Sequence, residues 1–338
     1  MAEGIGVGII GASRVAPEHA RAVQATGRTW LAGIADPDTA RAEIVAEPIG
    51  CEVYADYRDL LKRPDVGVVM LGLPNDLHCP IALDGLDAGK HVFVEKPMAN
   101  TLDECDRMIE AAERNGVRVF VGHSQRFFSA TVMAREAVRS GRYGAPVMAR
   151  DTWTKAFGVE GRPPWFLDRS RGGGMWLMNG AHMIDRTCWV LGSGVVAVSG
   201  WVGNPIHGIA ADDASIAYLR LKNGLSAHLF HAGFKENGVD QCGVELVLTD
   251  GMIEFDSYAN RFRVAEGGQY VEQPVEKVNP FVVEFGRMVD SIETGAPLAV
   301  PMGWARHIVA VMLAAEESGR NGREVVIPDR DYAEPDAG

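Results

Sequence analysis

The chain has 338 residues, of which 47% are hydrophobic and 23% are charged, and its formal net charge is −12. This length suggests two domains, and the composition is that of a globular protein with packed cores. The acidic balance and the absence of long basic runs exclude a surface built for the phosphate backbone, so we expect no nucleic-acid partner.

Cysteine usage and hydropathy narrow the class of protein further. The five cysteines are scattered and form no Cys-x-x-Cys pair, which argues against a disulfide framework and a zinc site. His207, His228 and His231 have no carboxylate at ligand spacing, so we assign no metal. No apolar run approaches ~18 residues and the first residues lack a secretory pattern. We therefore expect a cytoplasmic protein without a membrane partner.

The chain begins with a strand–turn–helix pattern. Ile5–Ile10 is an apolar, β-branched run typical of a buried parallel strand, and a helix is expected to open at Pro17. Between them lies a Gly-x-Gly-x-x-Gly/Ala fingerprint that starts at Gly11, ends at Ala16 and has Ser13 at its second glycine. In this motif the turn brings backbone close to a pyrophosphate. The serine hydroxyl could add a hydrogen bond to phosphate.

A second strand, Trp30–Ala35, ends at Asp36, twenty positions after Ala16. A carboxylate at this distance accepts hydrogen bonds from the adenosine ribose and repels a 2′-phosphate, which favours NAD over NADP. Arg41 is close enough in sequence to reach a phosphate, so NADP remains an alternative.

The alternation of apolar runs and helical stretches continues to residue 122 and predicts six strands. Helix termini are well marked in one case, where Thr101 and Glu104 form a capping box and Gly116 follows as a C-terminal cap. Strands alternating with helices predict a doubly wound parallel sheet, which is a Rossmann-type domain over residues 1–122. Bounds are predicted for three further strands, Val66–Leu71, His91–Val94 and Val117–Val121, so that five of the six strands are placed; the other helices are expected at Pro37–Glu47, Asp56–Lys62 and His78–Ala88.

Glu95-Lys96-Pro97 follows one of these strands directly. Ligands of open α/β sheets bind beyond the carboxyl ends of the strands, so Lys96 is a candidate active-site residue. The proline biases the lysine towards an extended backbone, and the Lys–Pro bond can be cis or trans.

The second domain, residues 123–330, has a different pattern, and its carboxy-terminal helices could pack back on the first domain. Two Asn-Gly or Asp-Gly turns, at Asn223 and Asp250, each join two strand-like runs and predict antiparallel hairpins. A long loop rich in Trp, Arg, Pro and Gly covers 153–175 and ends in three glycines, after which a helix is expected at 176–191. Strands are expected at 146–154, 195–201, 215–221, 225–231, 244–248, 252–256, 261–265 and 325–327, helices at 130–140, 281–292 and 302–318, and a frayed tail at 332–338.

Several short motifs in this order resemble the Gfo/Idh/MocA family of NAD(P)-dependent oxidoreductases, named for glucose-fructose oxidoreductase and inositol dehydrogenase. The resemblance implies an α/β protein with an amino-terminal Rossmann domain and an α+β domain whose large open, mostly antiparallel sheet lines the substrate site. It also implies that the second domain, residues 123–330, binds the substrate and mediates oligomerisation, which gives a homodimer or homotetramer. The motifs are Gly11–Ala16, Asp36, Leu73-Pro74-Asn75-x-x-His78, Glu95-Lys96-Pro97, Gly122-x-x-x-Arg126-Phe127, Gly172-Gly173-Gly174, Gly180-x-His182 and His182-x-x-Asp185.

The resemblance also assigns roles along the cofactor. The fingerprint and Asp36 would hold the adenosine half, the loop at Leu73 would line its path, and Glu95 would lie near the nicotinamide. The cofactor-binding residues it implies are Gly11, Ala12, Ser13, Arg14, Val15, Asp36, Arg41, Leu73, Pro74, Asn75, His78, Glu95, Lys96 and Gln125.

In the family, the lysine polarises the reacting hydroxyl and the histidine is the general base, which here gives Lys96 and His182 as catalytic residues. An aspartate lies four residues before that histidine in the family, but this chain has Met178, with Asn179 beside it. Three interpretations stay open: His182 acts alone with Lys96, Asn179 supplies the polar contact, or the site no longer dehydrogenates. The expected substrate-binding residues are Lys96, Arg126, Trp165, Met178, Asn179 and His182, with an ion pair as the alternative for Arg126 and packing as the alternative for Trp165 and Trp153.

These observations predict an oxidoreductase that transfers a hydride between a nicotinamide and a hydroxyl or keto carbon of a sugar, polyol or related cyclic alcohol. Two alternatives remain at this stage. One is a reductase of a keto-sugar, imine or enone, with His182 as the acid. The other is a non-catalytic sensor of NAD(P) or a sugar, which the replacement at Met178 favours.

Overall fold

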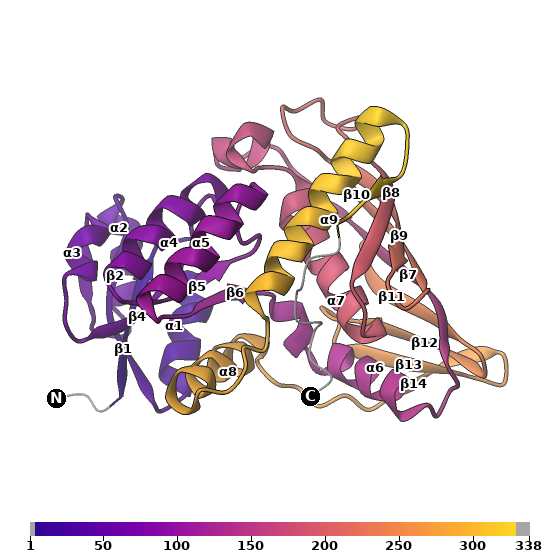
Figure 1. The fold of residues 1–338 in the computed structure, drawn as a ribbon, viewed down its shortest axis with the longest axis horizontal. Coiled ribbons are helices and arrows are strands. Elements are labelled where there is room, and N and C mark those ends of the chain that lie inside the picture. The colour runs from indigo at the N-terminus through magenta and orange to yellow at the C-terminus, as the bar shows by residue number, and fades with distance from the viewer. Residues whose placement is uncertain (1–3, 329–338) are drawn as a thin grey trace. The chain divides into compact units, whose positions relative to one another are not determined.

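The computed structural model describes residues 4–328, and the tail expected at 332–338 lies outside them. By its internal contacts the chain divides into two units. The first unit comprises the chain up to Gly122 together with Phe281–Arg306, and the second comprises His123–Pro280 together with the chain from His307. Each unit is built around one sheet (Figure 1).

The first unit contains a six-stranded sheet with the strand order β3-β2-β1-β4-β5-β6. Every neighbouring pair is parallel, which confirms the predicted Rossmann-type sheet. The central strands are apolar along their whole length because helices connect them and both faces are buried. The strands are β1 (Ile5–Ile10), β2 (Thr29–Ala35), β3 (Glu52–Tyr54), β4 (Val66–Leu71), β5 (His91–Glu95) and β6 (Val119–Gly122).

Helices alternate with these strands, and a late helix of the chain also belongs to this unit. The helix α8 (Pro280–Thr294) is tied to the region before β2 by Arg28, whose guanidinium lies 2.9 Å from both Asp290 and Glu293. The predicted capping box of α5 is present, and Gly116 closes that helix in the left-handed conformation. The other helices are α1 (Ala16–Ala25), α2 (Thr39–Ala46), α3 (Tyr57–Leu61), α4 (His78–Asp87) and α5 (Leu102–Asn115).

The second unit contains a nine-stranded sheet with the order β14-β13-β12-β11-β7-β10-β9-β8-β15. Its neighbours are antiparallel except for β7 and β10, which run parallel. Both predicted hairpins are confirmed, since β9 pairs with β10 and β11 with β12. The strands are β7 (Pro146–Ala156), β8 (Val195–Gly203), β9 (Ala214–Leu221), β10 (Ser226–Phe234), β11 (Gln241–Leu248), β12 (Gly251–Asp256), β13 (Arg261–Glu266), β14 (Gln269–Gln273) and β15 (Val325–Val326).

The two faces of this sheet differ in what covers them. Residues alternate between buried and exposed along β9, β10 and β11, as expected for a sheet with one packed face. The helices α6 (Ser129–Ser140) and α7 (Ala181–Leu191) pack against the buried face, on the same side of the sheet in Figure 1. The helix α9 (Met302–Asn321) also contributes here, because its Met312 carbonyl accepts a hydrogen bond from the Trp176 indole at 3.0 Å. On the opposite face, every second residue of β9, β10 and β11 is partly or fully exposed in the described part of the chain.

The capping box of α5 gives a direct test of this description of the first unit. Replacing Thr101 by alanine removes the side-chain oxygen that accepts a hydrogen bond from the Glu104 amide at 3.2 Å. We expect Thr101→Ala to lower the free energy of unfolding by about 1 kcal/mol, measured by urea denaturation. Thr101→Ser keeps the hydroxyl and serves as the control; equal losses in the two variants would contradict the cap.

Candidate active site

The backbone of the fingerprint turn after β1 has a fixed conformation that leaves no room for a side chain at Gly11. Gly11 has φ +98°, and a Cβ at this position would lie 2.4 Å from the Gly72 carbonyl oxygen, so only glycine fits. The Gly11 amide donates to the Ala35 carbonyl at 2.8 Å, which fixes the turn against β2. The hydroxyl of Ser13 is buried and has no hydrogen-bond partner among residues 4–328. A buried hydroxyl that the protein leaves unsatisfied at a dinucleotide fingerprint fits a phosphate ligand.

The carboxylate that follows β2 lies beside this turn. One oxygen of Asp36 accepts a hydrogen bond from the Ala12 amide at 2.8 Å, and the other accepts one from the Asp38 amide at 2.9 Å. The guanidinium of Arg41 donates to the Ala12 carbonyl at 3.0 Å, so both predicted residues flank the same turn. Arg14 is exposed on the turn itself and Val15 precedes helix α1. The residues at this end therefore fit the adenosine half of a dinucleotide.

A buried histidine connects the loops that follow β4 and β5. His78 lies with its Nδ1 2.9 Å from the Pro97 carbonyl and its Nε2 3.1 Å from the Leu73 carbonyl. Burial lowers the pKa of this imidazole. Both ring nitrogens of His78 contact backbone carbonyls, and the ring therefore holds the turn at Lys96 against the loop at Leu73. The Lys96–Pro97 peptide bond in this turn is cis. Pro74 is partly exposed and Asn75 is buried in the same loop.

The turn after β5 carries a second pair of titratable groups. Glu95 lies 3.1 Å from the Nε2 of His19, which is buried on α1. Burial opposes ionisation of Glu95, but the interaction with His19, together with the nearby Lys96 and His78, outweighs it, so the pKa of Glu95 is lowered. The pKa of Lys96 is lowered by burial, and the negative charge of Glu95 opposes that shift. Sequence reasoning missed His19, because a single histidine in an amphipathic helix carries no signal of its partner.

The second unit places His182 in a cluster of rings on the buried face of the sheet. His182 opens α7 and lies 6.4 Å, between ring centroids, from both His123 and Trp153. Trp153 on β7 is paired in register with His231 on β10, and their rings are 6.0 Å apart. The Asn179 amide donates to the Nε2 of His231 at 3.1 Å. Of the predicted substrate residues, Asn179 and His182 are thus brought to one cluster, with Trp153 at its centre.

Arg126 is held by an acidic partner in the same unit. Its guanidinium donates to both oxygens of Asp185 at 2.5–3.0 Å, and both side chains are buried. This is the ion-pair alternative considered for Arg126. The neighbouring Gln125 accepts a hydrogen bond from Arg186 at 2.6 Å, and Arg186 in turn binds Asp151 at 2.5 Å.

The helix expected to start at Trp176 begins with a π-helical turn, Trp176–Gly180, and only then continues as the α-helix α7. Gly174, at φ +106°, lets Asp212 approach so closely that a Cβ would lie 2.0 Å from its carboxylate. That carboxylate accepts a hydrogen bond from the Trp176 amide at 2.6 Å, and burial raises the pKa of Asp212 to about 7. Such π turns are frequent at functional sites.

Met178 lies within this π turn and packs against an apolar cluster formed by Phe157, Phe166 and Met175. Trp165 packs against the same cluster, with its ring 5.6 Å from that of Phe166. Both predicted substrate residues therefore have apolar packing contacts, and Asn179 is bonded to His231 rather than to His182.

Among residues 4–328 no group of three or more His, Cys, Asp or Glu side chains could hold a metal ion. Within the same residues, none of the helices combines the length and hydropathy that crossing a membrane requires.

Comparisons with known proteins agree with this geometry. A model of the oxidoreductase family with an NAD-binding Rossmann fold, Gfo/Idh/MocA, matches residues 5–123, and a model of that family's C-terminal domain matches residues 131–254. A 1,5-anhydro-D-fructose reductase of Ensifer adhaerens is 32% identical over 300 residues, which cover 85% of this chain and 87% of that protein. The chain belongs to the Gfo/Idh/MocA oxidoreductase family. Its first unit is accordingly the family's NAD-binding domain, and the protein is an NAD-binding oxidoreductase.

The chain matches other family members over different shares of their length. An inositol 2-dehydrogenase of Salmonella typhimurium is 26% identical over 96% of this chain and 97% of that protein. A 1-carboxy-3-chloro-3,4-dihydroxycyclohexa-1,5-diene dehydrogenase of Comamonas testosteroni is 34% identical over 189 residues, but the match spans only 48% of that protein and 56% of this chain. A levoglucosan dehydrogenase crystallised with NADH and levoglucosan superposes with a TM-score of 0.87 at 21% identity, covering 97% of this chain and 100% of that one. That structural likeness shows the shared fold.

Asp36 provides the test of the cofactor end in this family member. If Asp36 accepts hydrogen bonds from the ribose, we expect Asp36→Ala to raise the Kd for NAD by about 10- to 100-fold, because these bonds to a charged acceptor are lost. The Kd for NADP should rise less or fall, since the variant no longer repels a 2′-phosphate. Calorimetric titration of both nucleotides measures this, and Asp38→Ala, which removes only the cap of α2, is the control. A parallel change for NAD and NADP would contradict the assignment.

Proposed function

We propose that this oxidoreductase is an NAD-linked dehydrogenase that oxidises a hydroxyl group of a polyol, sugar or related cyclic alcohol. The observation that carries the proposal is that each unit holds one of the two groups required, a half-buried lysine directly after β5 in the NAD-binding domain and a buried histidine at the start of α7 in the second unit. The relatives support the substrate class, since they are named for inositol, an anhydro sugar and a dihydroxycyclohexadiene.

Each catalytic residue has a separate task in this proposal. The nicotinamide ring accepts the hydride when NAD is bound. His182 accepts the hydroxyl proton as general base, and the ammonium of Lys96 stabilises the negative charge that develops on the oxygen. In the reverse direction His182 donates the proton to a keto group. Because Met178 cannot relay a proton, the basicity required comes from the imidazole itself.

The remaining assignments at the cofactor and substrate follow the family. Ser13 and the amides of the fingerprint turn bind the pyrophosphate, and Asp36 binds the ribose, with Arg41 beside it. Leu73, Pro74 and Asn75 line the cofactor, while His78 and Glu95 keep the Lys96 turn in place. Gln125 and Arg126 act through α7, because their partners are Arg186 and Asp185.

Substituting the two proposed catalytic residues tests the function. We expect Lys96→Met and His182→Asn each to lower kcat/KM by about 10²- to 10⁴-fold, the usual contribution of a positioned acid or base. Both variants should still bind NAD, read as a rise in melting temperature. Lys62→Met, at an exposed lysine of the same unit, is the control. Turnover close to that of the wild type in Lys96→Met would refute the proposal, and NAD binding without turnover in the wild type would favour a sensor.

We further propose that the exposed face of the second unit's sheet binds a second copy of the chain, which gives a homodimer. Across three neighbouring strands Trp201, Ile216 and Phe230 are paired in register, and their exposed fractions of 39–43% make an apolar row. Exposed apolar rows of this kind are typical of protein–protein interfaces.

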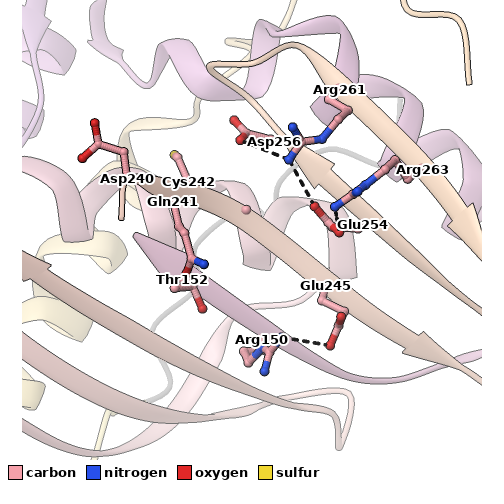
Figure 2. A pocket seen from close by; sticks show the side chains of 11 residues that line it. Arg150, Thr152, Asp240, Gln241, Cys242, Glu245, Glu254, Asp256, Arg261 and Arg263 are labelled. Atoms are coloured by element: carbon pink, nitrogen blue, oxygen red, sulfur yellow. Dashed lines mark hydrogen bonds and ion pairs between the residues drawn. The ribbon is translucent and has the colours of Figure 1, made fainter. Parts of the chain in front are cut away.

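Beside the apolar row the same face is charged and hollowed. The row continues through Thr152 to Gly243, where the small residues leave a hollow of about 320 Å³ (Figure 2). Around it lie charges of both signs, with Arg150 3.4 Å from Glu245, and Glu254 paired with Arg263. A face that carries both signs is able to complement itself across a two-fold axis, which supports a second copy as its occupant.

One substitution in the apolar row tests the dimer. Ile216→Asp places a charge at the centre of the row, and we expect it to convert a dimer into a monomer in size-exclusion chromatography with light scattering. Val239→Asp introduces the same charge at an exposed valine of the loop before β11 and should leave the dimer intact. A monomeric wild type, or a dimer that survives Ile216→Asp, would contradict the interface.

A further inference from the structure

The ring cluster around His182 also contains a cation that the function above does not use. Lys155 lies two residues after Trp153 on β7, so the two side chains are on the same, buried face of the sheet. Its ammonium lies 5.5 Å from the centre of the Trp153 ring. Gly233 on β10 is paired in register with Lys155. A Cβ atom added to Gly233 would lie within 2.6 Å of Met175 and Phe157. Lys155 therefore lies between the rings of His182, Trp153 and His231 and the apolar cluster of Phe157, Phe166 and Met175.

His231 lies next to this cation, and its contacts determine which of its ring nitrogens carries the proton. Burial together with the charges of Lys155 and Arg186 lowers the pKa of His231 to about 3, so its ring is neutral at physiological pH. Because the Asn179 amide donates to Nε2, the single ring proton is on Nδ1. That Nδ1 is buried and has no hydrogen-bond partner in the described residues. A buried N–H without an acceptor is rare in folded proteins and points to a ligand atom that accepts from it.

The acidic residues near the cluster are held by other groups. Asp151, on the same face of β7, accepts from Arg186 and from the Thr187 hydroxyl. Asp185, one turn after His182, is bound by Arg126. At the position one turn before His182, where the resembling enzymes have an aspartate, this chain has the apolar Met178. The cluster thus contains a cation and a neutral donor, and the carboxylates of Asp151 and Asp185 are bound by arginines.

We propose that Lys155 and His231 bind a carboxylate of the substrate, so that the alcohol oxidised here is a hydroxy acid. This inference rests on the proposed function, and it names the substrate class of the same site. One ammonium and one neutral N–H supply a donor for each oxygen of a monoanion, which suits a carboxylate better than a dianionic phosphate. The carboxylate anchors the substrate, and the hydroxyl that reacts with His182 lies elsewhere on the molecule.

Matched ligand pairs test the inference on the unmodified protein. Quinate, shikimate and glucuronate are each compared with the corresponding neutral carboxamide, in the presence of NAD, by calorimetric binding and by NADH formation. We expect the carboxylate of at least one pair to bind about 10- to 100-fold more tightly than its amide. Added salt should weaken binding of the carboxylate and leave that of the amide unchanged. Equal binding of acid and amide in every pair would overturn the inference.

Variants at Lys155 separate this inference from the proposed function. Lys155→Met keeps the side-chain length and should remove the preference for the acid, whereas Lys155→Arg should retain part of it. Lys235→Met, at an exposed lysine beyond β10, is the control. If neutral polyols are oxidised and Lys155→Met changes acid and amide equally, the inference fails while the function stands. If hydroxy acids bind through Lys155 without NADH formation, the function fails while the inference stands.

Discussion

The second unit depends on two buried ion pairs made by neighbouring residues of one helix. Asp185 of α7 binds Arg126, and Arg186 of α7 binds Asp151 on β7. Successive helical residues project about 100° apart, so the two pairs hold α7 from two directions. Breaking such a buried pair by removing one partner costs about 3–5 kcal/mol, because a charge is left without compensation. His182, one turn earlier on the same helix, is therefore positioned by charges as well as by apolar packing.

The NAD-binding side depends on a simpler constraint, the common edge formed by parallel strands. Gly11 follows β1, Asp36 follows β2 and Lys96 follows β5, so each residue is placed by the end of its strand. These positions could be predicted from the sequence because each is marked locally, by a glycine or a proline next to an apolar run. The two glycine-containing hairpins of the second unit could be predicted for the same reason. In both cases the physical requirement lies within a few residues of the motif.

Features that depend on distant partners could not be predicted in this way. The strands β3 (Glu52–Tyr54) and β14 (Gln269–Gln273) are short and polar. They form because β3 pairs with the edge of β2 and β14 with the edge of β13. The π turn before α7 depends on Asp212, which is more than thirty residues away in the chain and binds the Trp176 amide. The contacts of His19 with Glu95 and of Asn179 with His231 also join separate elements. Periodicity and capping rules carry no information about such pairs.

The replacement at Met178 is best understood from its surroundings. Its side chain packs on Phe157, Phe166 and Met175, an apolar environment in which an ionised carboxylate would lose part of its hydration. A negative charge there would also lower the affinity of the neighbouring cluster for an anion. Methionine in that place keeps this side of the cluster apolar. An apolar side chain at position 178 and a cation at position 155 together favour the carboxylate that we propose as the ligand.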